Sequence, residues 1–230
     1  MYRVGIHTLG ELEPQMAGPQ EMVRQVHEVI SSLLKLGKLV ALLGGEHSLS
    51  IGAVRAYSEL HPKLSVLQLD AHADLRDTYQ GTPYSHASTM RRVLEHVPAV
   101  QVGIRSLSHE EMTYIRQESL PVFFAQDLGK DPSWQERVLE RLTDQVYLTV
   151  DLDVLDPSIM PAVGTPEPGG LLWHPVLELI RKVAREKKIV GFDVVELSPL
   201  PGLVAPDFLA ARLTYKIIGY SLFSCNYSGG

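Results

Sequence analysis

The stretch SVLQLDAHADLRD, residues 65–77, joins an apolar run to a cluster of ionisable side chains. The apolar run has the length of a β-strand. A strand that is apolar throughout, rather than alternating, is typical of a parallel sheet covered by helices on both faces. Asp70, His72 and Asp74 follow the run directly, at the end of the strand where α/β sheets bind their ligands. The stretch therefore predicts both a fold class and the position of a functional site.

The rest of the chain repeats this alternation of short apolar runs and helical periodicity. An apolar run over 38–45 ends in two glycines, and further strands are expected at 64–69, 99–104, 120–124, 145–150 and 188–195. Helical spacing of apolar residues predicts helices at 18–37, 48–62, 86–96, 108–118, 133–142, 174–187 and 207–222. We expect a single three-layer α/β/α domain over residues 1–230, built on a mostly parallel sheet.

Composition excludes several classes of protein. The 230 residues are 45% hydrophobic with a net charge of -6, which does not suit a surface for nucleic acid or anionic lipid but tolerates a cationic ligand. Cys225 is the single cysteine, so a disulfide framework and a cysteine-rich zinc site are excluded. Neither a membrane-spanning run nor a secretory signal is visible. We expect a cytoplasmic protein with a small cationic substrate, no nucleic acid and no membrane partner.

Polar side chains recur where the predicted strands end. The candidates are His47, then Asp70, His72 and Asp74, then Asp151 and Asp153, and finally Asp193 and Glu196. In an extended segment alternate residues share one face, so each group is expected to converge on one rim of the sheet. Converging carboxylates repel one another unless a cation lies between them. Oxygen and imidazole donors without a thiolate favour a hard or borderline ion such as Mn²⁺, and this many donors suit a bridged pair.

An isolated Asp-x-Asp is usually a cap or a turn, but its recurrence after several strands argues against that interpretation here. Two further residues have open roles when judged from their own positions. His86 could carry protons near the first cluster, or it could cap the helix expected from residue 86. Glu196 could serve the site, or it could form a salt bridge or a cap.

Six motifs occur in a fixed order: GGEHS, DAHAD, SHAS, DLDVLDPS, GTPEPGG and DVVELSP. With them the chain resembles the ureohydrolase family of arginases and agmatinases, from about residue 40 to the C-terminus. The resemblance implies an arginase-like fold and a pair of Mn²⁺ ions. It implies that His47, Asp70, Asp74 and Asp151 hold one ion, and that Asp70, His72, Asp151 and Asp153 hold the other, so that Asp70 and Asp151 bridge.

The resemblance also implies a reaction. Two metal ions lower the pKa of a bridging water and produce a hydroxide that attacks a guanidinium carbon. Asp74 would aim this hydroxide, His86 would protonate the departing amine, and Glu196 would pair with the guanidinium. Thr165 would line the same pocket. The segment after DAHAD is unlike that of arginases, which favours agmatine as the substrate, with urea and putrescine as products and a role in polyamine biosynthesis.

Some alternatives remain open at this stage. Aminopropylagmatine, guanidinobutyrate and formimidoylglutamate are related substrates that the motifs do not exclude. Glu46 stands where many relatives have Asp, and the strand, helix and loop with which relatives usually begin are expected to be absent here. That expectation keeps open a non-catalytic metal-binding assembly subunit. A metallophosphoesterase is disfavoured because its later motifs are missing. By resemblance we expect a homo-oligomer, either a trimer or a hexamer.

Overall fold

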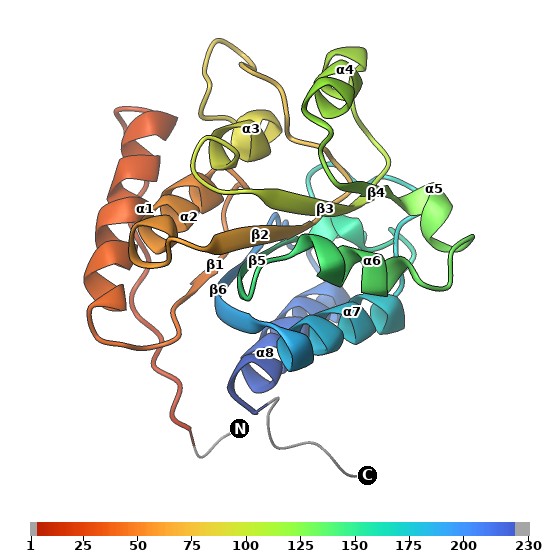
Figure 1. Ribbon diagram of the computed structural model, residues 1–230. Coiled ribbons are helices and arrows are strands. Elements are labelled where there is room, and N and C mark those ends of the chain that lie inside the picture. Colours follow the sequence, from red (N-terminus) through yellow and green to blue (C-terminus); the bar gives the residue numbers. More distant parts are fainter. Residues whose placement is uncertain (1–3, 224–230) are drawn as a thin grey trace.

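The computed structural model describes residues 4–223, so Cys225 lies outside the described residues. Its centre is a six-stranded sheet in the order β1-β6-β5-β2-β3-β4, and every neighbouring pair is parallel (Figure 1). The strands are β1 (Ala41–Leu43), β2 (Leu64–Leu69), β3 (Ala99–Ile104), β4 (Val122–Phe124), β5 (Gln145–Asp151) and β6 (Lys188–Val195). The predicted single α/β domain with a parallel sheet is confirmed.

Helices cover both faces of this sheet (Figure 1). The α-helices are α1 (Pro19–Leu34), α2 (Leu49–Leu60), α3 (Thr89–Val93), α4 (His109–Glu118), α5 (Ala125–Leu128), α6 (Trp134–Arg141), α7 (Trp173–Glu186) and α8 (Val204–Phe223). Two short 3-10 helices, η1 (His86–Ser88) and η2 (Leu152–Val154), follow the loops that carry the polar motifs. Among residues 4–223, no helix combines the length and apolar character needed to cross a membrane.

The sheet has a separate hydrophobic core on each face. Side chains alternate along a strand, so Leu148 of β5 packs with α6, α7 and α8 while its neighbour Tyr147 packs with α1, α2 and α3. Both side chains are at most 1% exposed. Burial on both faces explains why the strand sequences are mostly apolar and do not alternate, as the prediction of a covered parallel sheet required.

Most element boundaries agree with the prediction, and one helix differs. The helix expected at 86–96 is found as η1 followed directly by α3, and the Ser85 side chain caps η1 by accepting a hydrogen bond from the backbone N–H of Ala87. Elsewhere, α4 begins with a capping box, in which Ser108 and Glu111 each accept the other's backbone N–H.

The strand order places one crevice at the centre of the sheet. From β2 the chain continues outward to β3 and β4, whereas from β5 it continues to β6 on the other side. The loops after β2 and β5 therefore diverge, and the carboxyl ends of these two neighbouring strands form the topological switch point where α/β sheets bind ligands. Because β6 lies next to β5 and β1 lies next to β6, four strands deliver their terminal residues to one region.

Buried polar contacts fix the loop that follows β2. The Gln101 amide donates to the carbonyl oxygen of Ala73 at 2.7 Å, and the Glu111 carboxylate accepts the N–H of Leu75 at 2.9 Å. Gly103 approaches the same loop with φ of 96°, and a side chain there would come within 3.0 Å of the carbonyl oxygen of Asp70. The loop carrying Asp70, His72 and Asp74 is thus held by the neighbouring strand and helix.

Candidate metal centre and active site

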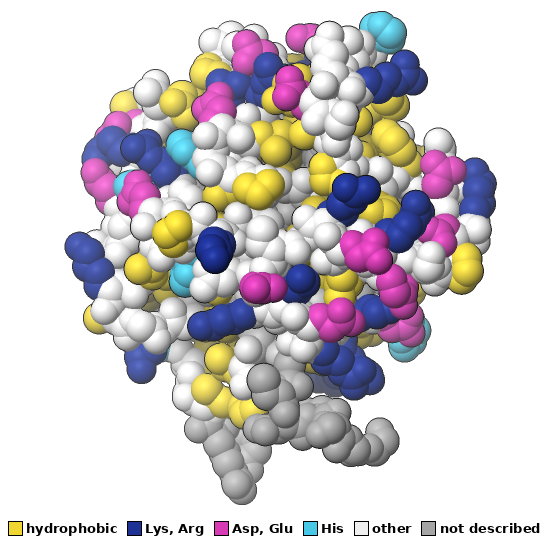
Figure 2. All heavy atoms as spheres, viewed as in Figure 1, with side chains coloured by type: hydrophobic (Ala, Val, Ile, Leu, Met, Phe, Trp, Pro, Cys, Tyr) yellow, Lys and Arg dark blue, Asp and Glu magenta, His cyan; other side chains and the backbone are white. Residues whose placement is uncertain are grey.

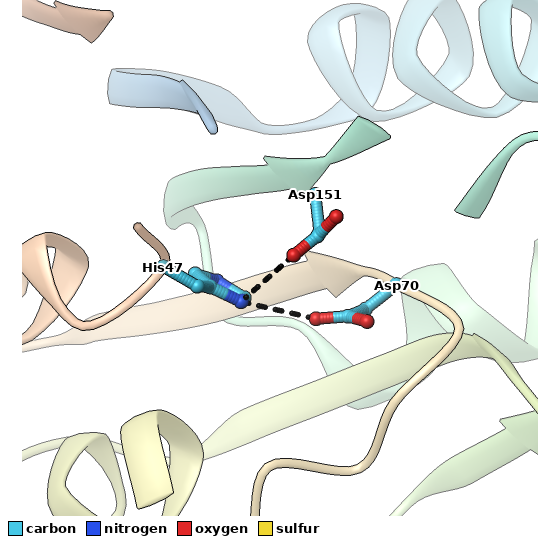
Figure 3. A group of neighbouring side chains, drawn as sticks. All are labelled: His47, Asp70 and Asp151. Carbon is cyan, nitrogen blue, oxygen red and sulfur yellow. Dashed lines mark ion pairs between the residues drawn. The ribbon is translucent and has the colours of Figure 1, made fainter. Parts of the chain in front are cut away.

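His47 is the centre of a buried cluster of carboxylates. It follows β1 after a turn in which Gly44 and Gly45 both have positive φ, and its side chain points toward Asp70 and Asp151 (Figure 3). The Nδ1 atom of His47 lies 3.1 Å from Oδ2 of Asp70, 3.0 Å from Oδ2 of Asp74 and 3.4 Å from Oδ2 of Asp151. Residues of three strand ends therefore meet at one nitrogen atom.

A second cluster shares Asp70 with the first. The Nδ1 atom of His72 lies 2.8 Å from Oδ2 of Asp153 and 3.7 Å from Oδ1 of Asp70. His47, Asp70 and Asp151 form one group that could hold a metal ion, and Asp70, His72 and Asp153 form the other. The two oxygens of Asp70 face different imidazoles, so Asp70 is placed to bridge two ions.

The geometry of the first cluster fits a divalent cation. Nδ1 of His47 is buried and makes no hydrogen bond within the described part of the chain. Two donors at right angles on an ion with bonds of about 2.1 Å lie about 3.0 Å apart, close to the 3.0 and 3.1 Å that separate this nitrogen from Asp74 and Asp70. Buried carboxylates and imidazoles without a thiolate suit Mn²⁺ or a similar ion.

The predicted residues converge, but not by simple alternation along extended strands. Asp74 has φ of 55°, so the chain turns after His72 and directs Asp74 toward His47 while His72 faces Asp153. Asp151 ends β5, whereas Asp153 lies in η2, and Asp151 accepts the backbone N–H of Asp153 at 2.9 Å. Local turns, not strand periodicity, thus distribute these side chains between the two clusters.

The ionisable side chains of this site have strongly shifted pKa values. Burial raises the pKa of Asp74 to about 7, with a further contribution from the neighbouring Asp70. Burial and the charges of Asp70 and Asp153 raise the pKa of Asp151 well above its usual range. Burial lowers the pKa of His72, but Asp153 and Asp70 outweigh it and raise that pKa to about 11. Carboxyl groups that resist ionisation, together with an imidazole that holds its proton strongly, indicate a site in which additional positive charge is stabilised.

Glu196 lies beside the first cluster. It follows β6 with a left-handed φ of 65°, and its Oε1 atom accepts the backbone N–H of His47 at 2.6 Å. Its Oε2 atom faces Gly164, where a Cβ atom would lie 3.9 Å away. Thr165 follows this glycine, and its hydroxyl lies 3.5 Å from Oδ2 of Asp153. The GTPEPGG loop therefore borders both Glu196 and the second cluster.

His86 lies at the exposed side of the site, at the start of η1 as the sequence suggested. Its side chain is 46% exposed, and its Nδ1 atom lies 3.1 Å from Oε1 of Glu46. The same oxygen accepts the backbone N–H of His86 at 2.7 Å. The edge of the Tyr79 ring packs against the imidazole, with the ring centroids 5.5 Å apart. Glu46 and Tyr79 thus hold the His86 side chain from two sides.

Three features of the site were not predicted. Asp193 was expected at the rim, but it lies inside β6 and is fully buried behind His47, with a hydrogen bond from Thr149. The contact of Glu46 with His86 was not expected from the sequence. The Arg105 guanidinium donates to the carbonyl oxygens of Asp153 at 2.7 Å and Glu167 at 2.8 Å, which fastens the GTPEPGG loop. The signal in the sequence for Asp193 was a polar residue inside an otherwise apolar strand.

The face of the molecule in Figure 2 carries charged side chains of both signs. On the face in Figure 2, Lys and Arg side chains are interspersed with Asp and Glu side chains, and hydrophobic patches separate them. No single sign of charge dominates this view.

Comparisons with known proteins agree with this geometry. The Arginase family matches residues 1–219. An N(1)-aminopropylagmatine ureohydrolase of Synechocystis is 40% identical, with 94% of this chain and 73% of the relative covered. An agmatinase of Pyrococcus horikoshii is 35% identical, with 87% of this chain and 68% of the relative covered. The crystal structure of the agmatine ureohydrolase of Thermoplasma volcanium superimposes with a TM-score of 0.84 at 34% identity, covering 94% of this chain and 73% of that one. The chain belongs to the arginase family of ureohydrolases.

Proposed function

We propose that this protein is a binuclear manganese hydrolase that releases urea from the guanidino group of aminopropylagmatine. The observation that carries the proposal is the pair of His/Asp clusters sharing Asp70, with Glu196 and His86 beside them. His47, Asp74 and Asp151 would complete one ion's ligands. His72, Asp153 and the bridging Asp151 would complete the other's. Two divalent ions would make water nucleophilic at neutral pH by lowering its pKa.

Glu196 is assigned to substrate binding. Its Oε1 atom is occupied by the His47 N–H, so Oε2 is the oxygen available to a guanidinium. Burial raises the pKa of Glu196, and a cationic partner would favour its charged form. A charge-assisted pair between this carboxylate and the guanidinium orients the carbon toward the clusters. Thr165 would border the same pocket from the GTPEPGG loop.

Proton movements are assigned to Asp74 and His86. Asp74 projects into the first cluster, where its carboxylate would accept a hydrogen bond from the attacking water and aim it. The departing amine leaves well only when protonated, and His86 is the imidazole at the exposed side of the site. Glu46 raises the pKa of His86, which favours the protonated form that donates to the amine.

The substrate preference rests on the relatives. Proteins named N(1)-aminopropylagmatine ureohydrolase are 38–42% identical to this chain, whereas the agmatinases are 34–35% identical. The sequence motifs favoured agmatine as the substrate. These identities favour aminopropylagmatine, so agmatine becomes the second candidate. Both substrates carry a guanidinium and an amine without a carboxylate, which suits a chain with a net charge of -6. We propose a cytoplasmic, homo-oligomeric enzyme of polyamine biosynthesis.

The test is urea release by Mn²⁺-loaded protein. We expect the highest kcat/KM with aminopropylagmatine, a lower value with agmatine, and little urea from arginine or guanidinobutyrate. A higher value with agmatine would return that substrate to first place. Two bound metals without urea from any guanidino compound would favour the non-catalytic assembly subunit. Formamide release from formimidoylglutamate would place the chain with a different substrate class.

A further inference from the structure

A buried chain of hydrogen bonds lies behind His47, on the side away from the carboxylate cluster. Nε2 of His47 lies 2.9 Å from the hydroxyl oxygen of Thr149. That hydroxyl donates to Oδ1 of Asp193 at 2.6 Å, and the Tyr147 hydroxyl donates to Oδ2 at 2.9 Å. None of these four side chains is more than 1% exposed. The chain joins β5 and β6 to the imidazole.

The directions of these hydrogen bonds determine which nitrogen of His47 carries a proton. A hydroxyl has one proton, and Thr149 gives it to Asp193, so the Thr149 oxygen can only accept from His47. Nε2 must then be the donor. In a neutral imidazole this leaves the lone pair on Nδ1, the atom that faces Asp70, Asp74 and Asp151. The hydrogen bond from Nε2 to Thr149 thus selects the tautomer that a metal ion requires at Nδ1.

The other imidazole has no such support. The His72 side chain is 25% exposed, and its Nε2 atom lies 3.9 Å from Oε1 of Glu167, beyond hydrogen-bond distance. Among the described residues, only His47 of the two is anchored by a buried hydroxyl and carboxylate. The two clusters should therefore respond differently when the chain of hydrogen bonds is broken.

We infer that Asp193, acting through the Thr149 hydroxyl, is a positioning residue that holds His47 with its proton on Nε2 and its Nδ1 atom toward the first metal ion. The inference rests on the proposed role of His47 as a metal ligand. Asp193 lies within the sheet and touches neither substrate nor ion. It acts by fixing the tautomer and ring orientation of the ligand, and it would thereby set the affinity of one of the two ions.

The test compares variants of Thr149 and Asp193 by metal content. Thr149→Val removes the hydroxyl at nearly constant volume, and Thr149→Ser retains it. After dialysis against graded Mn²⁺, we expect Thr149→Val to bind the His47 ion 10- to 100-fold more weakly and to show the spectrum of isolated Mn²⁺ by electron paramagnetic resonance. Thr149→Ser should keep the coupled pair. Tyr147→Phe is the matched control, because it removes a buried hydroxyl from Asp193 outside the path to His47, and it should bind both ions.

Two further variants show which of the two ions is weakened and provide a second test if Thr149→Val does not fold. His72→Asn removes a ligand of the other ion, so adding Thr149→Val to it should weaken binding of the remaining ion 10- to 100-fold relative to His72→Asn alone. Asp193→Asn is nearly isosteric and should reproduce the Thr149→Val result if that variant does not fold. Two ions with wild-type affinity in both Thr149→Val and Asp193→Asn, or equal weakening of both ions, would overturn the inference. Wild-type protein that binds fewer than two ions would instead contradict the proposed function.

Discussion

The Nδ1 atom of His86 lies 3.1 Å from Oε1 of Glu46, an oxygen that also accepts the His86 backbone N–H. Glu46 immediately precedes the proposed metal ligand His47. One carboxylate therefore connects the loop after β1 to the residue assigned to proton transfer. This contact relates the position of His86 to the position of the first cluster, although the two residues are 40 positions apart in sequence.

Replacing Glu46 with Gln should change the pH dependence of kcat. The Glu46 carboxylate raises the pKa of His86 because it favours the charged imidazolium. Without that charge His86 loses its proton at lower pH, so the descending alkaline limb of the kcat profile should move to lower pH. Glu46→Asp should restore part of the shift. Metal content is measured in parallel, and an unmoved alkaline limb with both ions bound would show that Glu46 does not act on the proton donor.

Glu196→Gln should weaken catalysis while leaving the metal ions bound. The amide keeps the shape of the side chain but loses the charge that pairs with the guanidinium. A hydrogen bond to a charged group contributes about 1.5–3 kcal/mol, so kcat/KM should fall roughly 10- to 100-fold. Glu178→Gln on the exposed side of α7 serves as the control and should have wild-type kinetics. Full activity in Glu196→Gln would remove Glu196 from the substrate site.

Metal removal should destabilise the protein more at neutral pH than at acidic pH. The pKa of Asp74 is raised to about 7 by burial and Asp70, so the folded, metal-free protein binds more protons than the unfolded chain. Its free energy of unfolding therefore falls as pH rises from about 5.5 to about 7.5. Metal binding opposes this because its ligands must be deprotonated.

The measurement is the difference in Tm between Mn²⁺-loaded and chelator-treated protein. The subtraction cancels groups far from the site. We expect the difference to widen steadily across that pH interval. A difference that is constant with pH, or that shrinks toward neutral pH, would contradict the assignment of these carboxylates as ligands.

Arg105→Met should loosen the GTPEPGG loop. The guanidinium is replaced by an apolar chain, and the carbonyl oxygens of Asp153 and Glu167 lose their donor. Loss of the donor to these partly buried acceptors should cost about 1–3 kcal/mol of unfolding free energy, measured by urea denaturation of metal-free protein. Arg116→Met, at an exposed position of α4, is the control. Equal stability of the two variants would show that Arg105 does not fasten the loop.

Patterns of residue type predicted the parts of this protein that local sequence controls. The bounds of β2, β3 and β6 coincide with their apolar runs, because strands buried on both faces are mostly apolar, and buried polar residues within them, such as Gln101 and Asp193, are hydrogen-bonded inside the protein. The convergence of Asp70 with His47 and Asp151 also followed from the rule that strand ends meet at one rim. The resemblance supplied the reaction, which the residues alone did not specify.

Features that depend on turns or on long-range contacts could not be obtained in this way. The positive φ of Asp74 reverses the chain at a residue type that does not demand it. Asp193 resembles a rim residue in sequence, yet it lies two positions before the end of β6 and faces Thr149 of another strand. The contact between Glu46 and His86 requires two loops to meet, and neither loop contains a signal for the other.

The central claim is that Asp70 bridges two metal ions. Anomalous X-ray diffraction from crystals saturated with Mn²⁺ tests it most directly. We predict two peaks of similar height, one beside His47 and one beside His72, about 3.5–4 Å apart with Asp70 between them. A single peak at full saturation, or two peaks that do not share Asp70, would contradict the account.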